Sequence, residues 1–201
     1  MKDMFASLEE DKKGAPKRIC YFDLETQRSA DEVGWENKDL MFMSVGVVYV
    51  EPENKFKFYT EDKVGYLIRE LEKADVIVGY NLINFDYKVL NYYTNNDLCQ
   101  LPTVDMMIDV NEALDRKRSL KLENVAMSTL GYGKTEQDAT IVFDWFKKGL
   151  IRNIAHYCKG DVAVTRDVYH YGRDRGIIYY TNINGEKKEV EGIRWKVRRG
   201  E

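Results

Sequence analysis

The stretch RICYFDLET, residues 18–26, is a short and mostly apolar run that is typical of a buried β-strand. Asp23 and Glu25 interrupt it, and because side chains alternate along a strand, both are expected on the same face. Two carboxylates held together among apolar neighbours repel each other and are costly to desolvate, unless a cation lies between them. The alternative is that both lie in water at a strand end, which is common for an isolated D-x-E pair.

Alternating strand and helix patterns follow this stretch. LMFMSVGVVYV (40–50) and KFKFYT (55–60) predict two further strands, which make a three-strand meander with the first. The later patterns predict helices at residues 62–74, 84–93 and 119–131, strands at residues 75–80 and 103–110, and one or two helices within residues 143–176. Asn184-Gly185, between two strand-like runs, predicts a terminal hairpin.

Length and composition indicate one α/β domain. The chain has 201 residues, of which 44% are hydrophobic, and we expect a single domain over residues 17–201. Within it, residues 176–201 are expected to form the terminal hairpin and a basic tail. Residues 1–16 are charged and predict a flexible lead-in. No run of eighteen apolar residues occurs, so we do not expect the protein to bind or cross a membrane. We expect a cytoplasmic location.

The cysteines and the net charge exclude several classes of site. The three cysteines, Cys20, Cys99 and Cys158, are odd in number and have no C-x-x-C spacing, which argues against a disulfide framework and a thiolate zinc site. A net charge of −3 is not typical of a protein that binds nucleic acid through a basic surface. An acidic enzyme still acts on phosphates when bound metal ions supply positive charge.

A second group of polar residues follows an apolar run in VIVGYNLINFDYKVL, residues 76–90. Asn81 opens a loop after the predicted strand, and Asp86 lies near the start of the next helix. Sites in α/β sheets form outside the carboxyl ends of strands, where loops lead into helices. Asp86 is therefore a candidate site residue, although helix capping or interaction with the helix dipole is the simpler role for it alone.

A third acidic residue, Asp161, lies in IAHYCKGDVAVT, residues 154–165, which has helical apolar spacing. Tyr157 precedes it by four residues, so the two share one side of a helix, whereas His156 precedes it by five and is rotated by roughly 140°. Helix geometry favours Tyr157 as the partner of Asp161. The simpler roles are a solvated charge for Asp161 and a half-buried core aromatic for Tyr157.

Taken together, DLET, NLINFD and YCKGD resemble the motifs of the DEDD, or DnaQ-like, 3′-5′ exonucleases of the ribonuclease H-like superfamily. The resemblance covers residues 18–176, and it is closest to the predicted YprB-type branch, which carries a segment similar to residues 25–49 that contains Trp35. It implies a ribonuclease H-like fold, in which helices flank a central mixed sheet made of a meander and parallel strands. A C-terminal β-hairpin would follow.

The resemblance also implies an enzyme, a metal-dependent 3′-5′ exonuclease that hydrolyses phosphodiester bonds at 3′ ends of nucleic acid. Single-stranded DNA is the favoured substrate, with RNA as an alternative. In the family, four carboxylates hold two divalent cations, and oxygen ligands suit Mg²⁺ or Mn²⁺. The matching metal ligands and catalytic residues here are Asp23, Glu25, Asp86 and Asp161.

The same motifs imply a catalytic tyrosine or histidine that positions the attacking water. The chain satisfies both the Y-x3-D pattern, through Tyr157, and the H-x4-D pattern, through His156. YCKGD resembles the helix of the tyrosine subclass, DEDDy, so Tyr157 is the expected catalytic residue. His156 is then expected to be a partly exposed neighbour on another helix face.

Substrate contacts and alternative functions are less closely defined by the motifs. By resemblance, Leu24, Thr26, Asn81 and Phe85 line the 3′-terminal nucleotide, although a core position for Phe85 is equally compatible with the sequence. Basic residues that contact phosphates, or are simply solvated, are Lys134, Arg194, Lys196, Arg198 and Arg199. The alternatives are a ribonuclease or structure-specific endonuclease on this fold, and a non-catalytic nucleic-acid-binding module, against which the intact acidic positions argue.

Overall fold

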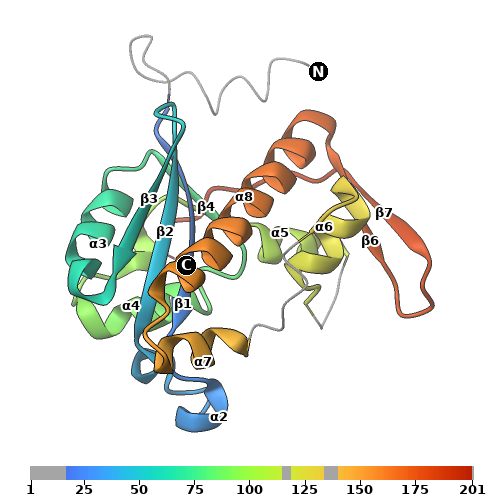
Figure 1. The fold of residues 1–201 in the computed structure, drawn as a ribbon. Coiled ribbons are helices and arrows are strands. Elements are labelled where there is room, and N and C mark those ends of the chain that lie inside the picture. Colours follow the sequence, from blue (N-terminus) through green and yellow to red (C-terminus); the bar gives the residue numbers. More distant parts are fainter. Residues whose placement is uncertain (1–16, 115–118, 134–139, 201) are drawn as a thin grey trace.

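A five-stranded sheet forms the centre of the protein in the computed structural model, which describes residues 17–114, 119–133 and 140–200 (Figure 1). Its strands lie in the order β3-β2-β1-β4-β5. The bounds are β1 Ile19–Thr26, β2 Met43–Glu51, β3 Lys55–Thr60, β4 Val76–Gly79 and β5 Thr103–Asp105. The first three strands are antiparallel neighbours, and β4 and β5 run parallel to β1, which confirms the predicted meander and mixed sheet.

Alternation along β1 sends its side chains into two separate cores. Tyr21 packs into the core that α8 covers, whereas Cys20, Phe22 and Leu24 pack into the core on the other face. All four side chains are buried because both faces of the central strand are covered by other elements. Asp23, between Phe22 and Leu24, therefore projects toward α8.

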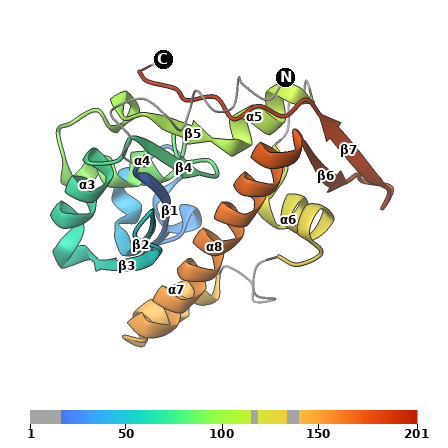
Figure 2. The same ribbon diagram turned by 90° about the horizontal axis from the view of Figure 1, so that it is seen from above.

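Helices cover both faces of the sheet, as Figure 2 shows. α8 (Ile151–Arg175) covers one face, and α3 (Val64–Glu72) and α4 (Asp86–Leu90) cover the other. α6 (Leu122–Leu130) packs beside α8 and against the terminal hairpin. The remaining helices are α2 (Ala30–Val33), α5 (Met106–Ala113) and α7 (Ile141–Lys147). Single 3₁₀ turns are η1 (Lys38–Met41), η2 (Glu61–Lys63), η3 (Asn91–Tyr93) and η4 (Leu98–Gln100).

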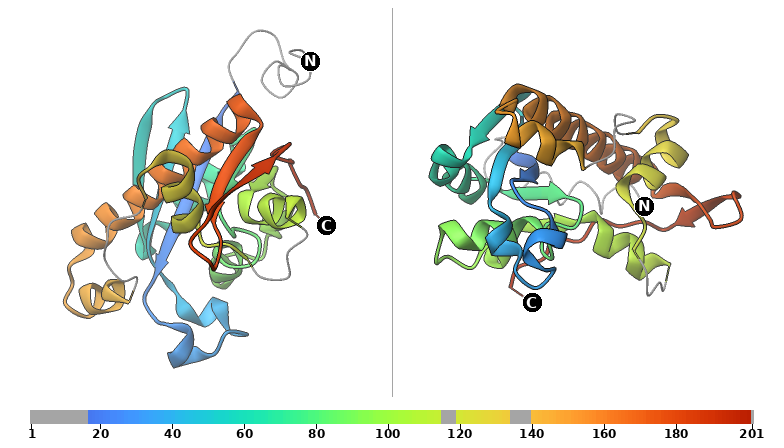
Figure 3. Two further views of the ribbon diagram at one scale, coloured as in Figure 1. Left: turned by 90° about the vertical axis from the view of Figure 1, so that its right-hand side faces the viewer. Right: turned by 60° about the horizontal axis from the view of Figure 1, so that its bottom comes forward.

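The long helix α8 and the terminal hairpin end the fold as the sequence predicts. α8 stops at Gly176, which has φ 68° and therefore takes the left-handed conformation that glycine favours. The hairpin that follows consists of β6 (Ile177–Thr181) and β7 (Lys187–Glu191), and both strands turn one side chain, Ile178 or Val190, into the core. Figure 3 (left) shows the chain running from this hairpin back beside α5.

Several element boundaries differ from the sequence prediction; for example, residues 40 and 41, predicted as strand, belong to the 3₁₀ turn η1. Residues 103–110 were predicted as one strand, but β5 ends at Asp105 and α5 begins at Met106. The reason is local, because the Asp105 side chain accepts a hydrogen bond from Met107 N at 3.2 Å and so caps a helix. The helix predicted at residues 84–93 is also divided, into α4 and the 3₁₀ turn η3.

The cysteines and the helix lengths bear on disulfides and membrane spans. Cys20, Cys99 and Cys158 carry free thiols, and Cys20 and Cys158 are buried. Across the ranges that the structure describes, every helix is too short or too polar to cross a bilayer. The predicted lead-in, residues 1–16, and the candidate phosphate contact Lys134 lie outside the described residues.

Candidate active site

Two of the predicted carboxylates lie near the carboxyl end of β1. Asp23 and Glu25 are both half-buried. Leu24 and Thr26, which alternate with them along the strand, are buried on the other face. The register between β1 and β2 shifts between Glu25 and Thr26, so regular pairing ends immediately after the D-x-E motif. These two carboxylates therefore share one face of the sheet, at a point where the strand opens toward solvent.

The helix α8 presents its predicted residues to that same face. The Cys158 thiol donates to the Asp23 carbonyl oxygen at 3.3 Å, and its Sγ lies 3.6 Å from Asp23 Oδ2. One ligand atom each from Asp23, Glu25 and Cys158 lies within 4.8 Å of the others. Tyr157 and Asp161 belong to the same stretch of α8, and both are buried.

Asp86 reaches the site from the other side of β1. It is the first residue of α4, is only 2% exposed, and accepts a hydrogen bond from Leu24 N at 3.1 Å. This contact connects the second motif to the backbone of the first. The position agrees with the prediction that Asp86 follows the β4 loop, and it excludes a purely solvated capping role.

The four carboxylates influence one another and Cys158 electrostatically. Burial and then the neighbouring charge of Asp23 raise the pKa of Asp86 well above its ordinary value. Burial raises the pKa of the Cys158 thiol, and four carboxylates add to that effect in the order Asp23, Glu25, Asp161 and Asp86. The negative charges of all four predicted metal ligands therefore raise the pKa of one buried group, the Cys158 thiol.

This arrangement fits divalent cations by the chemistry of its donors. Four carboxylates supply oxygen ligands of the kind that Mg²⁺ and Mn²⁺ prefer. The like charges that raise the pKa of Asp86 would be offset by a cation between them. Asp23 and Glu25 are half-buried rather than enclosed, so part of each residue is open to solvent.

Tyr157 and His156 occupy different environments on α8. Tyr157 is 5% exposed, and its ring meets the Trp145 ring of α7 edge to face, with centroids 6.3 Å apart. His156 is exposed. The structure thus brings Tyr157 to the side of α8 that faces the sheet and leaves His156 outside, in agreement with the helix geometry expected from the sequence.

The four predicted substrate contacts are distributed between the core and the loop. Leu24 is a core side chain whose N–H is engaged by Asp86, and Thr26 is buried, with its hydroxyl donating to Arg28 O at 3.0 Å. Asn81 has φ 72° and is half-buried, and Phe85 is half-buried against the core beneath α4. Asn81 and Phe85 therefore flank the loop that leads to Asp86.

Asp105, which sequence reasoning missed, holds that loop in place. It is fully buried, and its carboxylate accepts hydrogen bonds from Asn81 N at 2.8 Å and Ile83 N at 3.1 Å, besides capping α5. Burial raises its pKa, and the backbone hydrogen bonds act in the opposite direction. The available signal was an acidic residue inside an apolar run, directly before Met106, which indicates a cap rather than a strand interior.

Two basic residues of the C-terminal tail form ion pairs within the fold, which the sequence did not indicate. Arg198 donates to Asp109 Oδ1 at 2.7 Å and to Glu112 Oε1 at 3.1 Å, and Lys196 pairs with Glu112 at 2.6 Å. These two cations are thus engaged by carboxylates of α5. Arg194 and Arg199, the other candidates in the tail, are exposed.

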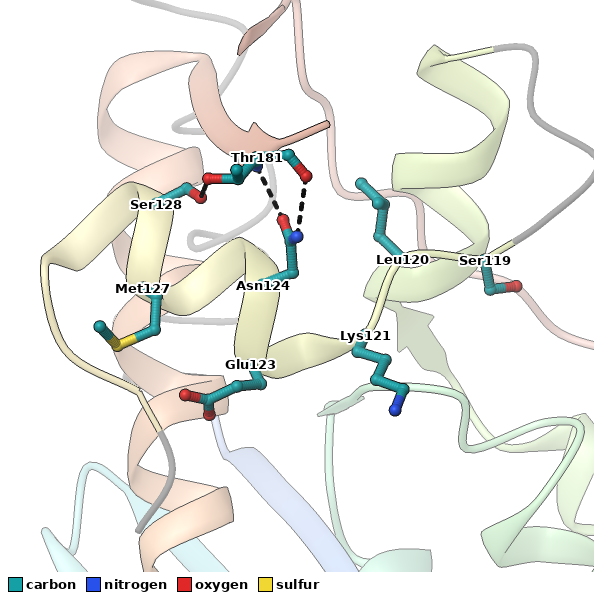
Figure 4. A pocket seen from close by; sticks show the side chains of 8 residues that line it. All are labelled: Ser119, Leu120, Lys121, Glu123, Asn124, Met127, Ser128 and Thr181. Carbon is teal, nitrogen blue, oxygen red and sulfur yellow. Dashed lines mark hydrogen bonds between the residues drawn. The ribbon is translucent and has the colours of Figure 1, made fainter. Parts of the chain in front are cut away.

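A separate cavity of about 530 Å³ lies between α6 and β6 (Figure 4). Asn124 both donates to Thr181 O at 2.8 Å and accepts from Thr181 N at 2.9 Å, and the Ser128 hydroxyl bonds to that of Thr181. In Figure 4, the side chains of Lys121 and Glu123 point away from Asn124 and Thr181. None of the predicted catalytic or metal-ligand residues is among the residues that line the cavity, and three of its lining residues, Asn124, Ser128 and Thr181, dock the hairpin on α6.

Comparison with known proteins identifies the family. A family profile described as the RNase_H superfamily matches residues 20–172. The chain belongs to the RNase_H superfamily. All four carboxylates and Tyr157 fall inside the matched region. The match agrees with the resemblance to the ribonuclease H-like superfamily found in the sequence.

Solved structures extend the comparison to the fold. The family B DNA polymerase from the hyperthermophilic archaeon Pyrobaculum calidifontis is similar, with a TM-score of 0.56 and 16% sequence identity. The similarity covers 81% of this chain and 25% of that chain, so the present chain spans about a quarter of the polymerase. No curated protein matches. The ribonuclease H-like α/β fold, with its mixed sheet and terminal hairpin, is thereby confirmed for this member of the RNase_H superfamily.

Proposed function

We propose that this chain is a metal-dependent 3′-5′ exonuclease that hydrolyses phosphodiester bonds at the 3′ ends of nucleic acid, most favourably single-stranded DNA. Within the superfamily, we assign it to the DEDD exonucleases, to their tyrosine subclass and to the YprB-type branch. The observation that supports the assignment is that one ligand atom each from Asp23, Glu25 and Cys158 lies within 4.8 Å of the others, while Asp86 accepts from the N–H of Leu24 between the two acidic residues. The buried Asp161 lies on α8 three residues after Cys158. A chance D-x-E pair would have no reason to lie against both the residue that begins α4, Asp86, and the α8 turn that carries Cys158.

In this proposal, Asp23, Glu25, Asp86 and Asp161 hold two Mg²⁺ or Mn²⁺ ions. When bound, these ions supply positive charge that stabilises the attacking and leaving oxygens of the phosphodiester. The N–H of Leu24 and the thiol of Cys158 fix two of the carboxylates through the contacts described above.

The hydroxyl of Tyr157 would position the water that attacks the phosphorus. Tyr157 is held at one edge by the Trp145 ring and by its place on α8, four residues before Asp161. Positioning of a reactant reduces the entropic cost of reaching the transition state. The 3′-terminal nucleotide would lie against the loop that contains Asn81 and Phe85, beside the backbone of Leu24 and Thr26.

We propose further that residues 17–201 act as one domain. Ile178 and Val190 of the hairpin and Trp195 of the tail share a core with Val162 and Val168 of α8. A shared core of this kind favours cooperative folding of the hairpin and tail with the sheet.

The decisive experiment incubates 5′-labelled single-stranded and duplex DNA and RNA with the protein in Mg²⁺, Mn²⁺ or EDTA. We expect a 3′-to-5′ ladder in the presence of metal and its loss in EDTA. The isosteric change Asp23→Asn should reduce the rate by more than about 100-fold, because it removes a charged metal ligand. Circular dichroism of the variant controls for folding.

Other outcomes separate the alternatives. Cleavage of circular single-stranded DNA, which has no 3′ end, would assign an endonuclease instead, and a preference for RNA would assign a ribonuclease. Binding without degradation under every metal condition would contradict the enzymatic proposal and favour a nucleic-acid-binding module.

A further inference from the structure

Residues 27–42 form a closed loop directly after the strand that carries Asp23 and Glu25. Gln27 N donates to Phe42 O at 2.9 Å, and Arg28 N donates to Met41 O at 3.1 Å, so backbone hydrogen bonds close the base of the loop. Figure 3 (left) shows this segment, which contains α2, projecting from the end of β1. The loop therefore adjoins the end of the sheet where the carboxylates lie.

Large aromatic side chains are exposed along this loop and the neighbouring turn η3. Trp35 is 63% exposed and Tyr92 is 56% exposed. Phe42 packs edge to face on Tyr92, with ring centroids 4.6 Å apart, and Tyr92 contacts Tyr93 in the same way at 5.1 Å. Tyr93 is anchored, since its hydroxyl donates to Glu61 at 2.7 Å and accepts from Met43 N at 3.1 Å.

Two cations accompany these rings. The guanidinium carbon of Arg28 lies 4.7 Å from the Phe42 ring centroid. Lys38 Nζ donates to Trp35 O at 2.7 Å and lies 6.0 Å from the Trp35 ring centroid. A planar guanidinium and aromatic ring faces are the groups on which unpaired bases stack in protein complexes. We call Arg28, Trp35, Lys38, Phe42 and Tyr92 the aromatic platform.

Backbone strain keeps one of these rings out of the core. Met41 and Met43 are 1% and 0% exposed, yet Phe42 between them is half-buried and has φ 52°. A bulky side chain at positive φ is uncommon and costs free energy that surrounding structure must offset. Backbone conformation alone would favour a glycine here, so we take the phenylalanine ring to have a use outside the core.

We propose that the aromatic platform binds the single-stranded nucleotides that precede the 3′ end, by stacking their bases on Trp35 and Tyr92. The inference rests on the proposed function, because it takes the 3′-terminal nucleotide to lie at the carboxylates. From there the strand must leave across a neighbouring surface, and the loop that carries four of the five platform residues begins directly after β1. Ring faces stack any base, so the surface selects unpaired strands rather than a sequence.

The charge around the platform sets how binding should respond to salt. Asp31, Glu32, Glu36 and Asp39 lie in the same loop, so acidic groups outnumber its two cations, Arg28 and Lys38. Affinity supplied by phosphate contacts falls steeply with salt, whereas affinity supplied by stacking does not. The contribution of Trp35 and Tyr92 to affinity should therefore be nearly independent of salt concentration.

The test measures binding of 5′-fluorescein oligothymidylates of two to eight nucleotides by fluorescence anisotropy, in EDTA so that the strand stays intact. Trp35→Ala and Tyr92→Ala should each weaken binding of the longer oligomers at least about fivefold at both 50 and 200 mM salt. Dinucleotide binding should change little, because a dinucleotide is too short to reach the platform. Trp35→Phe should restore much of the lost affinity, since it restores a stacking face.

Tyr66→Ala provides the matched control. Tyr66 of α3 is also 63% exposed and carries the Arg69 guanidinium 4.6 Å from its ring centroid, but it lies outside the platform. Its loss should leave affinity unchanged. Equal affinity in the Trp35→Ala, Tyr92→Ala and Tyr66→Ala variants would overturn the proposal, and would leave a protein partner as the occupant of the platform.

The outcome is also distinguishable from failure of the exonuclease proposal. If the wild-type protein degrades DNA in Mg²⁺ while the platform variants bind as it does, only the platform is wrong. If the platform variants bind weakly but the wild type degrades no substrate, stacking holds and the exonuclease assignment is wrong.

Discussion

At the scale of single residues, the adjacent residues Tyr157 and His156 of α8 differ in their burial and in the side of the helix that they occupy. Tyr157 lies under Trp145 on the sheet side of the helix, and His156 is exposed. A step of one residue rotates a side chain by about 100° around the helix, which is enough to separate core from solvent. The position of Asp161 four residues later selects Tyr157, since residues at that spacing share a face.

This difference gives the first prediction. Tyr157→Phe removes only the hydroxyl and should lower kcat about 100-fold, because the attacking water loses its orienting hydrogen bond. His156→Ala should remain within about twofold of the wild type. Single-turnover rates on 5′-labelled single-stranded DNA measure both. The reverse ranking would assign the protein to the histidine subclass.

Asp105 gives a second prediction at this scale. Asp105→Asn leaves one acceptor oxygen for three backbone donors, so at least one buried N–H loses its partner, at a cost of about 1–3 kcal/mol in the free energy of unfolding. Amide exchange at Ile83 should also accelerate. Asp97→Asn is the matched control, because Asp97 caps η4 through Cys99 N at 3.1 Å but is exposed. Equal losses in urea denaturation would remove the special role of Asp105.

At the scale of elements, the boundary between β5 and α5 shows why the sequence pattern predicted a strand where the structure has a helix. The apolar pattern of residues 103–110 fits a strand, and hydrophobic periodicity over so short a run does not distinguish strand from helix. Asp105 decides it, because its carboxylate serves the α5 cap and the loop after β4 together. The second of these contacts joins residues 24 positions apart, which no local pattern contains.

The docking of the terminal hairpin on α6 gives a prediction of its own. Asn124→Ala removes both hydrogen bonds to the main chain of Thr181 and should lower the free energy of unfolding by about 1–3 kcal/mol. Hydrogen exchange in β6 should accelerate more than exchange in β1. Asn153→Ala, at an exposed position in the first turn of α8, is the control. Unchanged exchange in β6 would show that the apolar contacts of Ile178 suffice.

At the scale of the whole molecule, the C-terminal tail is fastened across the edge of the sheet. Arg198 forms a β-bridge with Thr103, through backbone hydrogen bonds of 2.8 and 3.0 Å, and its side chain reaches Asp109. Asp109 also accepts from Lys196 N at 3.0 Å. The tail thus covers the exposed edge of β5, which would otherwise present unpaired backbone groups.

The burial of Asp109 beneath the tail predicts a pH dependence of stability. Burial raises the pKa of Asp109 from its ordinary value of 3.8 to about 6, while Arg198 acts in the opposite direction. The folded state therefore holds the proton more tightly than the unfolded chain. The contribution of Asp109 to stability is fully present below about pH 4 and is lost as pH rises to about 6, a change of about 3 kcal/mol.

Asp109→Asn should remove that component. Urea denaturation of both proteins between pH 4 and 7 measures it, as the difference between their free energies of unfolding. If this difference stays constant across the range, the Asp109 carboxyl does not titrate as described.

The sequence by itself indicated the fold class and the motif residues of the candidate site, but not helix α5 or the role of Asp105. Alternation in RICYFDLET places Asp23 and Glu25 on one face, and helix geometry separates Tyr157 from His156, because these relations depend only on backbone periodicity. Tertiary structure alone decided that Asp86 meets Leu24, that Cys158 lies among the carboxylates, and that Arg198 is bound to Asp109. Those contacts join segments distant in the chain, and packing of the whole fold fixes which of them form.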